Sequence, residues 1–387
     1  MKTSSFIIFL SIVLLVYGSL NYYIFIRGWQ AIPRISLLRT NYLILFLILS
    51  SSFFAGRILE RYYPSIFSDI LVWIGSFWLG AILYFFLIII FLDILRLINN
   101  SFPFFPAFAT FDYLKTKSAV LMISILAVFV LLGFGFINAK NPVIKELKLN
   151  VNKSAGNLKV LNIVMASDIH LGTIIGKNRL KEIVDKINGL NADIVLLPGD
   201  IVDEDVAPVI RNDIGSILIR IKSKYCTYAL TGNHEYIGGV EPAVNYLSEH
   251  NINILRDSVL KIDDSFYLVG REDRSISSFA GKKRKELSAL LSETDKSLPI
   301  ILMDHQPFGL DSAVKNGIDL QISGHTHNGQ LFPINLIEKF IFELSSGYLK
   351  KEQTHFYVST GVGTWGPPVR IGNRPEIVNI KLLFIEQ

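Results

Sequence analysis

Two stretches of the chain, "LKVLNIVMASDIHLG" at residues 158–172 and "ADIVLLPGD" at residues 192–200, decide the fold. Each begins with a run of branched and straight apolar residues and ends on polar residues beside a glycine. The apolar runs are continuous rather than alternating, which is typical of strands buried on both faces of a sheet. Further runs of this kind follow at residues 226–232, 265–270, 299–304, 318–324 and 355–361.

Polar segments with apolar residues at helical spacing lie between several of these runs. In residues 177–189, "KNRLKEIVDKING", the apolar side chains recur on one helical face, and Gly189 is a common helix stop. Residues 207–223 and 241–250 have the same character. Alternating strands and helices predict a layered α/β architecture for this half of the chain.

The first 138 residues have a different composition, with nine of the 38 Lys and Arg and four of the 33 Asp and Glu. A bilayer core needs about 20 apolar residues, and three of four apolar stretches reach this length, while the second is shorter. No ionisable residue lies in the middle of a stretch, which argues against an ion pathway. We therefore expect a membrane anchor over residues 1–138, a connector with a possible edge strand over 139–157, and a soluble domain over 158–387. The four stretches are Phe6–Ile26, Tyr42–Phe54, Ile70–Leu92 and Ala119–Ile137.

The orientation of the anchor depends on its basic residues. The first stretch also fits a cleaved signal peptide, but three further stretches and no clear small-residue cleavage site favour a retained helix. With four spans, one group of loops has six basic residues against three in the other, which places the C-terminal half outside the cytoplasm by the positive-inside rule. Lys140, Lys145 and Lys148 would even this count if they were included. The larger group is Arg27, Arg34, Arg39, Arg96, Lys115 and Lys117; the smaller is Lys2, Arg57 and Arg61.

Composition argues against a disulfide-bonded protein and against a nucleic-acid-binding protein. The single cysteine, Cys226, rules out an intrachain disulfide, and we expect it to be a buried small apolar residue. The net charge of +5 is modest, and the sequence has no cluster of basic residues, so we expect no nucleic-acid partner.

Polar clusters follow the predicted strands. In open α/β sheets, ligands bind outside the carboxyl ends of the strands, so these clusters would face one crevice. A single Asp after a strand is most often a turn former. Here, however, five of the seven histidines recur at such positions beside Asp or Asn. The residues are Asp168, His170, Asp200, Asp203, Asn233, His234, Glu235, His305, His325 and His327.

These residue types indicate a metal site. Imidazoles and carboxylates without thiolates suit Mn, Fe or Zn better than Mg or Ca. Alternate side chains of an extended segment point to one side, so Asp168 and His170 can bind one ion. His325 and His327 share this spacing and could bind one ion or two. About seven candidate ligands exceed the four of a closed zinc site and suit two ions that share a bridging ligand.

The order D-x-H, G-D-x-x-D, G-N-H-E, H and G-H-x-H over residues 160–330 resembles the calcineurin-like metallophosphoesterase superfamily. The resemblance implies a four-layer sandwich of two mixed β-sheets flanked by helices. It also implies that His234 is the catalytic histidine, oriented by Asp203, that Glu235 orients ligands, and that a metal-bridging hydroxide is the nucleophile. One metal would be held by Asp168, His170, Asp200 and His327, and the other by Asp200, Asn233, His305 and His325.

Departures from the family pattern narrow the expected activity. Glu204 and Asp205 follow Asp203 where phosphoprotein phosphatases have Arg-Gly, which argues against that activity. The segments "GHTHNGQLFP" and "STGVGTWGPPVRIGNRPEI", residues 324–333 and 359–377, resemble a bacterial membrane-associated branch. That branch includes phosphodiesterases and UDP-diacylglucosamine hydrolase-like enzymes of lipid A synthesis. In the second segment, Arg370 or Arg374 is either a phosphate contact or an ordinary loop residue.

We therefore expect a membrane-anchored phosphoester hydrolase with two divalent metal ions, most simply a phosphodiesterase that acts on a lipid-linked or surface phosphoester. One alternative is a UDP-diacylglucosamine pyrophosphate hydrolase. Another is a non-catalytic, metal-stabilised membrane sensor. A transporter with a regulatory domain is disfavoured by the uncharged membrane segments.

Overall fold

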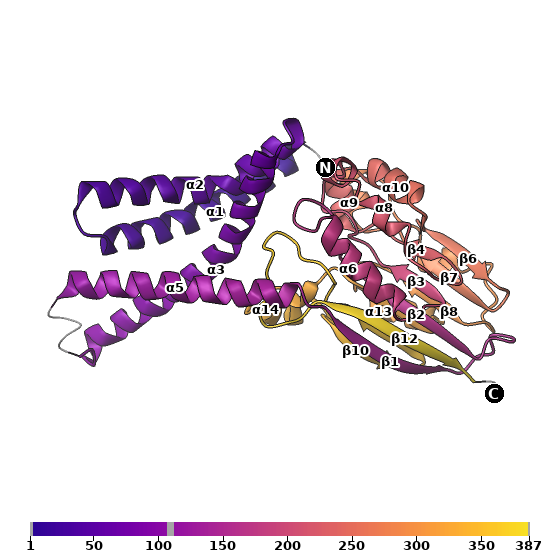
Figure 1. Cartoon of the computed structure of the whole chain (residues 1–387). Coiled ribbons are helices and arrows are strands. Elements are labelled where there is room, and N and C mark those ends of the chain that lie inside the picture. Colours follow the sequence, from indigo (N-terminus) through magenta and orange to yellow (C-terminus); the bar gives the residue numbers. More distant parts are fainter. Residues whose placement is uncertain (1–2, 107–111, 386–387) are drawn as a thin grey trace. The chain divides into compact units, whose positions relative to one another are not determined.

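The computed structural model describes residues 3–106 and 112–385 (Figure 1). The chain divides into two compact units, one of Met1–Phe136 with Gly366–Val369, and the other of Ile137–Trp365 with Arg370–Gln387.

Within the described residues, the first unit contains four long helices (Figure 1). All four are long and apolar enough to cross a membrane, and each contains one of the predicted apolar stretches. The short second stretch lies inside a helix of 27 residues. Small residues let two of the helices approach closely, since a Cβ on Gly75 would lie 2.3 Å from the Cα of Phe53. The helices are α1 (Thr3–Ala31), α2 (Ser36–Tyr62), α3 (Ile66–Ser101) and α5 (Tyr113–Ala139).

The described part of the second unit forms two six-stranded sheets. The first has the order β1-β12-β2-β3-β4-β5, in which β2 to β5 are parallel and β12 is antiparallel to β2. It consists of β1 (Val143–Val151), β12 (Glu376–Phe384), β2 (Val160–Met165), β3 (Ile194–Leu197), β4 (Thr227–Ala229) and β5 (Ile252–Ile254).

The second sheet has the order β10-β11-β9-β8-β7-β6, with antiparallel pairs at both ends and parallel strands between them. All seven predicted runs contain a strand, and the predicted fold of two mixed sheets flanked by helices is confirmed. The strands are β10 (Gly347–Lys351), β11 (Thr354–Val358), β9 (Leu320–Ser323), β8 (Ile300–Met303), β7 (Phe266–Gly270) and β6 (Ser258–Ile262).

Three apolar cores separate the four layers. Alternate residues of β2 face opposite ways. Val164 packs with Ile183 of helix α6 (Lys177–Asn188), whereas Ile163 packs between the sheets with Leu268 of β7. On the far side of the second sheet, Val269 packs against helix α13 (Leu310–Lys315). Strands buried on both faces explain the continuous apolar runs of the sequence.

The remaining helices are short. Segment 177–189 forms α6 as predicted, but residues 207–223 form two short helices, because Asp213 between them adopts a left-handed backbone with φ +46°. The helices are α6 (Lys177–Asn188), α7 (Ala207–Arg211), α8 (Gly215–Leu218), α9 (Asn233–Gly238), α10 (Val240–Glu249), α11 (Ile276–Phe279), α12 (Leu287–Leu290), α13 (Leu310–Lys315), η1 (His327–Gly329) and α14 (Ile334–Ile341).

The structure corrects one expectation and extends another. Cys226 is exposed rather than buried, and it lies directly before β4 with φ +68°. The connector at 139–157 holds the nine-residue strand β1, at the edge of the first sheet, which pairs in parallel with β12 along its whole length.

Candidate metal centre

Every residue singled out from the sequence as a ligand or catalytic group follows the carboxyl end of a strand. Asp168 and His170 follow β2, Asp200 and Asp203 follow β3, and Asn233 and His234 open α9 after β4. In the second sheet, His305 follows β8, and His325 and His327 follow β9. Since β2, β3 and β4 are parallel, as are β8 and β9, each set of loops emerges at one edge of its sheet.

One group of donor atoms comes from Asp168, His170 and His327. Each offers an atom within 4.8 Å of the others, and all three side chains are buried. Nε2 of His327 lies 3.0 Å from Nε2 of His170 and 3.7 Å from Oδ1 of Asp168. These atoms are close enough to bind one ion together.

A second group comes from Asp200, His305 and His325, again within 4.8 Å of one another. The side-chain oxygen of Asn233 lies 2.8 Å from Nδ1 of His325 and 3.2 Å from Nε2 of His305. Oδ2 of Asp200 is 3.2 Å from Nε2 of His305 and 4.0 Å from Nε2 of His170. The Asp200 carboxylate therefore lies between the two groups.

His234 and Asp203 lie beside the first group. Nδ1 of His234 is 3.4 Å from Oδ1 of Asp203. The His234 ring meets the His170 ring edge-on at 4.6 Å and the Trp365 ring at 5.6 Å. His234 is thus fixed from three sides, with Asp203 at one ring nitrogen.

Burial and charge divide the histidines by protonation state. Burial lowers the pKa of His170 and of His325 to about 3, so both rings are neutral at physiological pH. Neutral imidazole is the form that binds metals. Burial also opposes a charge on His234, but the carboxylates of Asp200 and Asp203 outweigh it and raise the pKa of His234 to about 9.

The donor set fits divalent cations. Asp168 and Asp200 are buried carboxylates, and Oδ2 of Asp168 has no hydrogen-bond partner among the described residues. A buried carboxylate without a compensating charge is costly, and a cation supplies that charge. Mixed nitrogen and oxygen donors without sulfur are those that first-row ions such as Mn, Fe and Zn accept.

The backbone of these loops is unusual. Residues other than glycine rarely adopt a positive φ, although Asp, Asn and His do so more often than others. The amide of Asp168 donates to Gly199 O at 3.1 Å, and that of His170 donates to Asp200 O at 3.0 Å, which holds the strained loops in place. The candidate ligands with a positive φ are Asp168 (+53°), His170 (+54°), Asp200 (+52°), His325 (+74°) and His327 (+49°).

Glu235 orders the loop that bears Asp200. Its buried carboxylate accepts hydrogen bonds from the amides of Asp200 at 3.2 Å, Ile201 at 2.7 Å, Val202 at 2.9 Å and Gly232 at 2.6 Å. Burial raises the pKa of Glu235 to about 7, while the bonds from Val202 and Gly232 oppose that rise. The carboxylate therefore supplies the acceptors that backbone carbonyl groups would supply in a helix or a sheet.

Gln330 of segment 324–333 and Trp365 of segment 359–377 have roles that the sequence did not indicate. Gln330 donates to Trp365 O at 2.8 Å and accepts from the Trp365 amide at 2.9 Å, which fixes Trp365 beside His234. Both residues stand next to glycines, in "HNGQ" and "GTWG", but these motifs do not reveal that the two residues bond to each other.

The two arginines of segment 359–377 differ in burial and in their contacts. Arg370 is buried, donates to Gly363 O at 2.6 Å, and lies with Nη2 3.0 Å from Nδ1 of His327. It therefore holds segment 359–377 against His327. Arg374 donates to Asn141 O in an exposed position.

Two mixed sheets with a cluster of His, Asp and Asn side chains at the ends of their strands are the features of a metal-dependent hydrolase. The family model for calcineurin-like phosphoesterases matches residues 161–329. Together with the relatives described next, this match shows that the chain belongs to the calcineurin-like phosphoesterase family and is a metal-dependent phosphoester hydrolase.

Several curated proteins are similar over longer ranges. A Danio rerio protein described as a transmembrane protein with metallophosphoesterase domain is 33% identical over 300 residues, which cover 74% of this chain and 67% of the relative. An uncharacterized metallophosphoesterase of Helicobacter pylori strain J99 is 34% identical, over 62% of this chain and 64% of its own length. One from Campylobacter jejuni is 30% identical, over 97% of this chain and 98% of its own length. None of these names states a substrate.

Proposed function

We propose that this chain is a membrane-anchored phosphodiesterase that uses two divalent metal ions and acts on a lipid-linked or surface phosphoester. The observation that carries the proposal is the pair of adjoining donor groups, buried except for the partly buried His325, with Asp200 between them. When bound, two such ions would activate a water molecule and neutralise charge on the phosphoryl group.

The residues have separate roles in this proposal. Asp168, His170 and His327 hold one ion, and Asn233, His305 and His325 hold the other, with Asp200 shared. Mn, Fe and Zn are the ions that suit these donors.

His234 donates a proton to the leaving-group oxygen. In the metal-free chain, the carboxylates of Asp200 and Asp203 outweigh burial and raise the pKa of His234 to about 9, which favours the protonated ring that this role needs. Asp203, 3.4 Å away, orients the ring.

A lipid-linked substrate is supported by α14, which directly follows the loop of His327. None of the helix residues is buried, and Phe340 is 92% exposed. An amphipathic helix with exposed apolar residues suits the membrane interface. The exposed apolar residues of α14 are Leu336, Ile337, Phe340 and Ile341.

The proposal also fixes an orientation. If all four long helices span the bilayer, the N-terminus and the phosphoesterase unit lie on one side, and the α1–α2 and α3–α5 connections on the other. The basic residues near those connections favour the cytoplasm for the connections, and hence an extracytoplasmic phosphoesterase unit. Protease accessibility on intact cells tests this, and protection of the unit until lysis would contradict it.

Activity is tested with full-length protein in detergent, loaded with Mn, on bis(para-nitrophenyl) phosphate. Asp200→Asn and His327→Ala should lose both bound metal and turnover. His234→Asn should keep its metal and lose turnover by about 10²–10⁴-fold, the usual contribution of a general acid. His250→Asn, outside the site, is the matched control and should match the wild type.

Two results would overturn these assignments. No turnover with bound Mn, Fe or Zn would remove the enzymatic proposal and favour a metal-stabilised sensor. Loss of metal from His234→Asn would contradict the role of His234 as a proton donor.

A further inference from the structure

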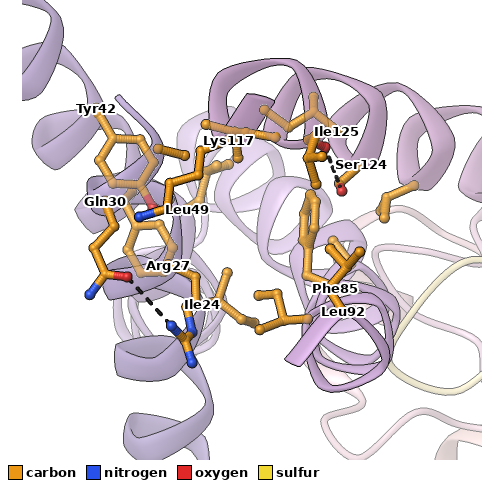
Figure 2. A pocket seen from close by; sticks show the side chains of 18 of the residues that line it. Ile24, Arg27, Gln30, Tyr42, Leu49, Phe85, Leu92, Lys117, Ser124 and Ile125 are labelled. Atoms are coloured by element: carbon orange, nitrogen blue, oxygen red, sulfur yellow. Dashed lines mark hydrogen bonds between the residues drawn. The ribbon is translucent and has the colours of Figure 1, made fainter. Parts of the chain in front are cut away.

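The first unit, here called the helical unit, contains a cavity of about 340 Å³ lined by α1, α2, α3 and α5 (Figure 2). This volume lies within the roughly 300–1,000 Å³ of small-molecule pockets. Most of the lining is apolar, as Figure 2 shows for Leu49 of α2, Phe85 and Leu92 of α3, and Ile125 of α5. An apolar space of this size can hold a hydrocarbon chain.

The lining also contains a cluster of charges. Arg27 of α1 and Arg96 of α3 both pair with Asp93, the latter at 3.2 Å. Lys117 of α5 lies over the ring of Tyr113, and it has no carboxylate partner among the described residues. Three cations and one carboxylate leave an excess of positive charge at the cavity wall, and Figure 2 shows Arg27 and Lys117 reaching the lining from their two helices.

The charges and the apolar residues lie at different depths. Arg27, Arg96 and Lys117 are all near the helix ends that adjoin the α1–α2 and α3–α5 connections. On α5 the lining continues from Lys117 to Leu132, a rise of about 22 Å along the helix. The cavity is therefore elongated, with cations near one end and apolar side chains along the rest.

We propose that this cavity binds one anionic phospholipid, with its phosphate at Arg27, Arg96 and Lys117 and an acyl chain along the apolar wall. Charged groups within a membrane are expensive unless they are paired, and a phosphate would pair the excess cations. A helix of a second copy, about 10 Å wide, is too large for this space, and free phosphate would leave the apolar wall uncovered. The proposal is independent of the phosphoesterase activity and needs only a helical unit within the bilayer.

The test is native mass spectrometry of delipidated full-length protein with an equimolar mixture of phosphatidylglycerol and phosphatidylcholine of the same chain length. The wild type should retain one phosphatidylglycerol with a preference of about tenfold or more, since each basic residue near a membrane surface attracts anionic lipid. An excess of inorganic phosphate should not displace it, because phosphate lacks the acyl chain.

Two pairs of variants separate the charge from the cavity. Lys117→Gln should lower the preference by about fivefold, whereas Lys115→Gln, at a side chain that is 87% exposed, should not. Ser124→Trp should fill the cavity and reduce retention of both lipids, and it breaks no bond to another helix among the described residues, where Ser124 donates to Val120 O of its own helix. Ile123→Trp, at a 65% exposed position outside the lining, is its control.

Each contrary result has a distinct meaning. Equal retention of the two lipids by the wild type would refute the anionic headgroup site. Unchanged retention in Ser124→Trp would show that the lipid binds elsewhere. If Ser124→Trp does not fold, Lys117→Gln decides the matter alone, and a preference equal to that of Lys115→Gln would refute the proposal. Lipid-free dimers would identify a second copy of the chain as the occupant.

Discussion

The substitution Glu235→Gln tests whether one buried carboxylate maintains the loop that bears Asp200. Oε1 of Glu235 accepts from the amides of Ile201 and Val202, and Oε2 accepts from those of Asp200 and Gly232. Glutamine has nearly the same shape but replaces one oxygen by an NH₂ group. Two of the four amides would then face a donor.

The expected loss follows from these contacts. Each buried amide left without an acceptor costs about 1–3 kcal/mol, so two of them cost about 2–6 kcal/mol. For a domain of this size, the lower bound corresponds to a fall in Tm of at least about 4 °C. Since Asp200 is held by the same carboxylate, affinity for the metal should fall by about 10–100-fold.

Thermal unfolding and Mn titration of the full-length protein in detergent measure both effects. Glu249→Gln is the control, because Glu249 is an exposed residue of α10 and its change should stay within about 0.5 kcal/mol. A Tm for Glu235→Gln within about 2 °C of the wild type would refute the argument that these bonds order the loop.

Three further outcomes are expected. Chelation should lower the Tm of the full-length protein, and a hundredfold excess of Mn over its Kd should restore about 2.7 kcal/mol; no shift would mean that the carboxylates do not bind metal. Gly361→Ala should weaken Mn binding, because its Cβ would lie 2.8 Å from the Cβ of Asp168, whereas Gly156→Ala, also at positive φ but in open space, should leave Mn binding unchanged. Phe340→Asp should slow hydrolysis of a phosphodiester in liposomes but not of a soluble aryl diester, with Phe279→Asp as the exposed apolar control; equal slowing of both reactions would place Phe340 outside membrane contact.

Much of the fold could be predicted because a strand that is buried on both faces of a sheet needs apolar residues at successive positions, which gives a continuous apolar run in the sequence. Strands such as β2 and β9 have this pattern and were predicted. Strand β1 was expected only as a possible edge strand, since "VIKELKLNV" is largely exposed and carries charges. Its partner β12 lies more than 200 residues away, and no local signal links the two.

The candidate site shows the same division. The strand-end positions of candidate ligands such as Asp168 and His305 were predicted because a polar residue after a buried strand falls at a known edge of the sheet. Their proposed roles came from the recurrence of His, Asp and Asn at such positions and from the family resemblance. The contacts of Trp365 were not, since its position depends on a pair of bonds to Gln330, 35 residues away. Pairwise contacts of this kind depend on tertiary structure and leave no periodic pattern in the chain.

The left-handed backbone at the five candidate ligands makes the proposed chemistry costly in folding stability. At each position an L-residue costs roughly 1–2 kcal/mol relative to a right-handed conformation, whereas glycine adopts the same φ without that penalty. Glycine there would ease the folding of the metal-free chain while deleting a ligand. If the reaction were no longer needed, glycine substitutions at these positions would be favoured, because they would stabilise the fold while removing the candidate metal ligands. The Asp and His side chains at these five positions therefore lower the stability of the metal-free chain, a cost that bound metal would offset.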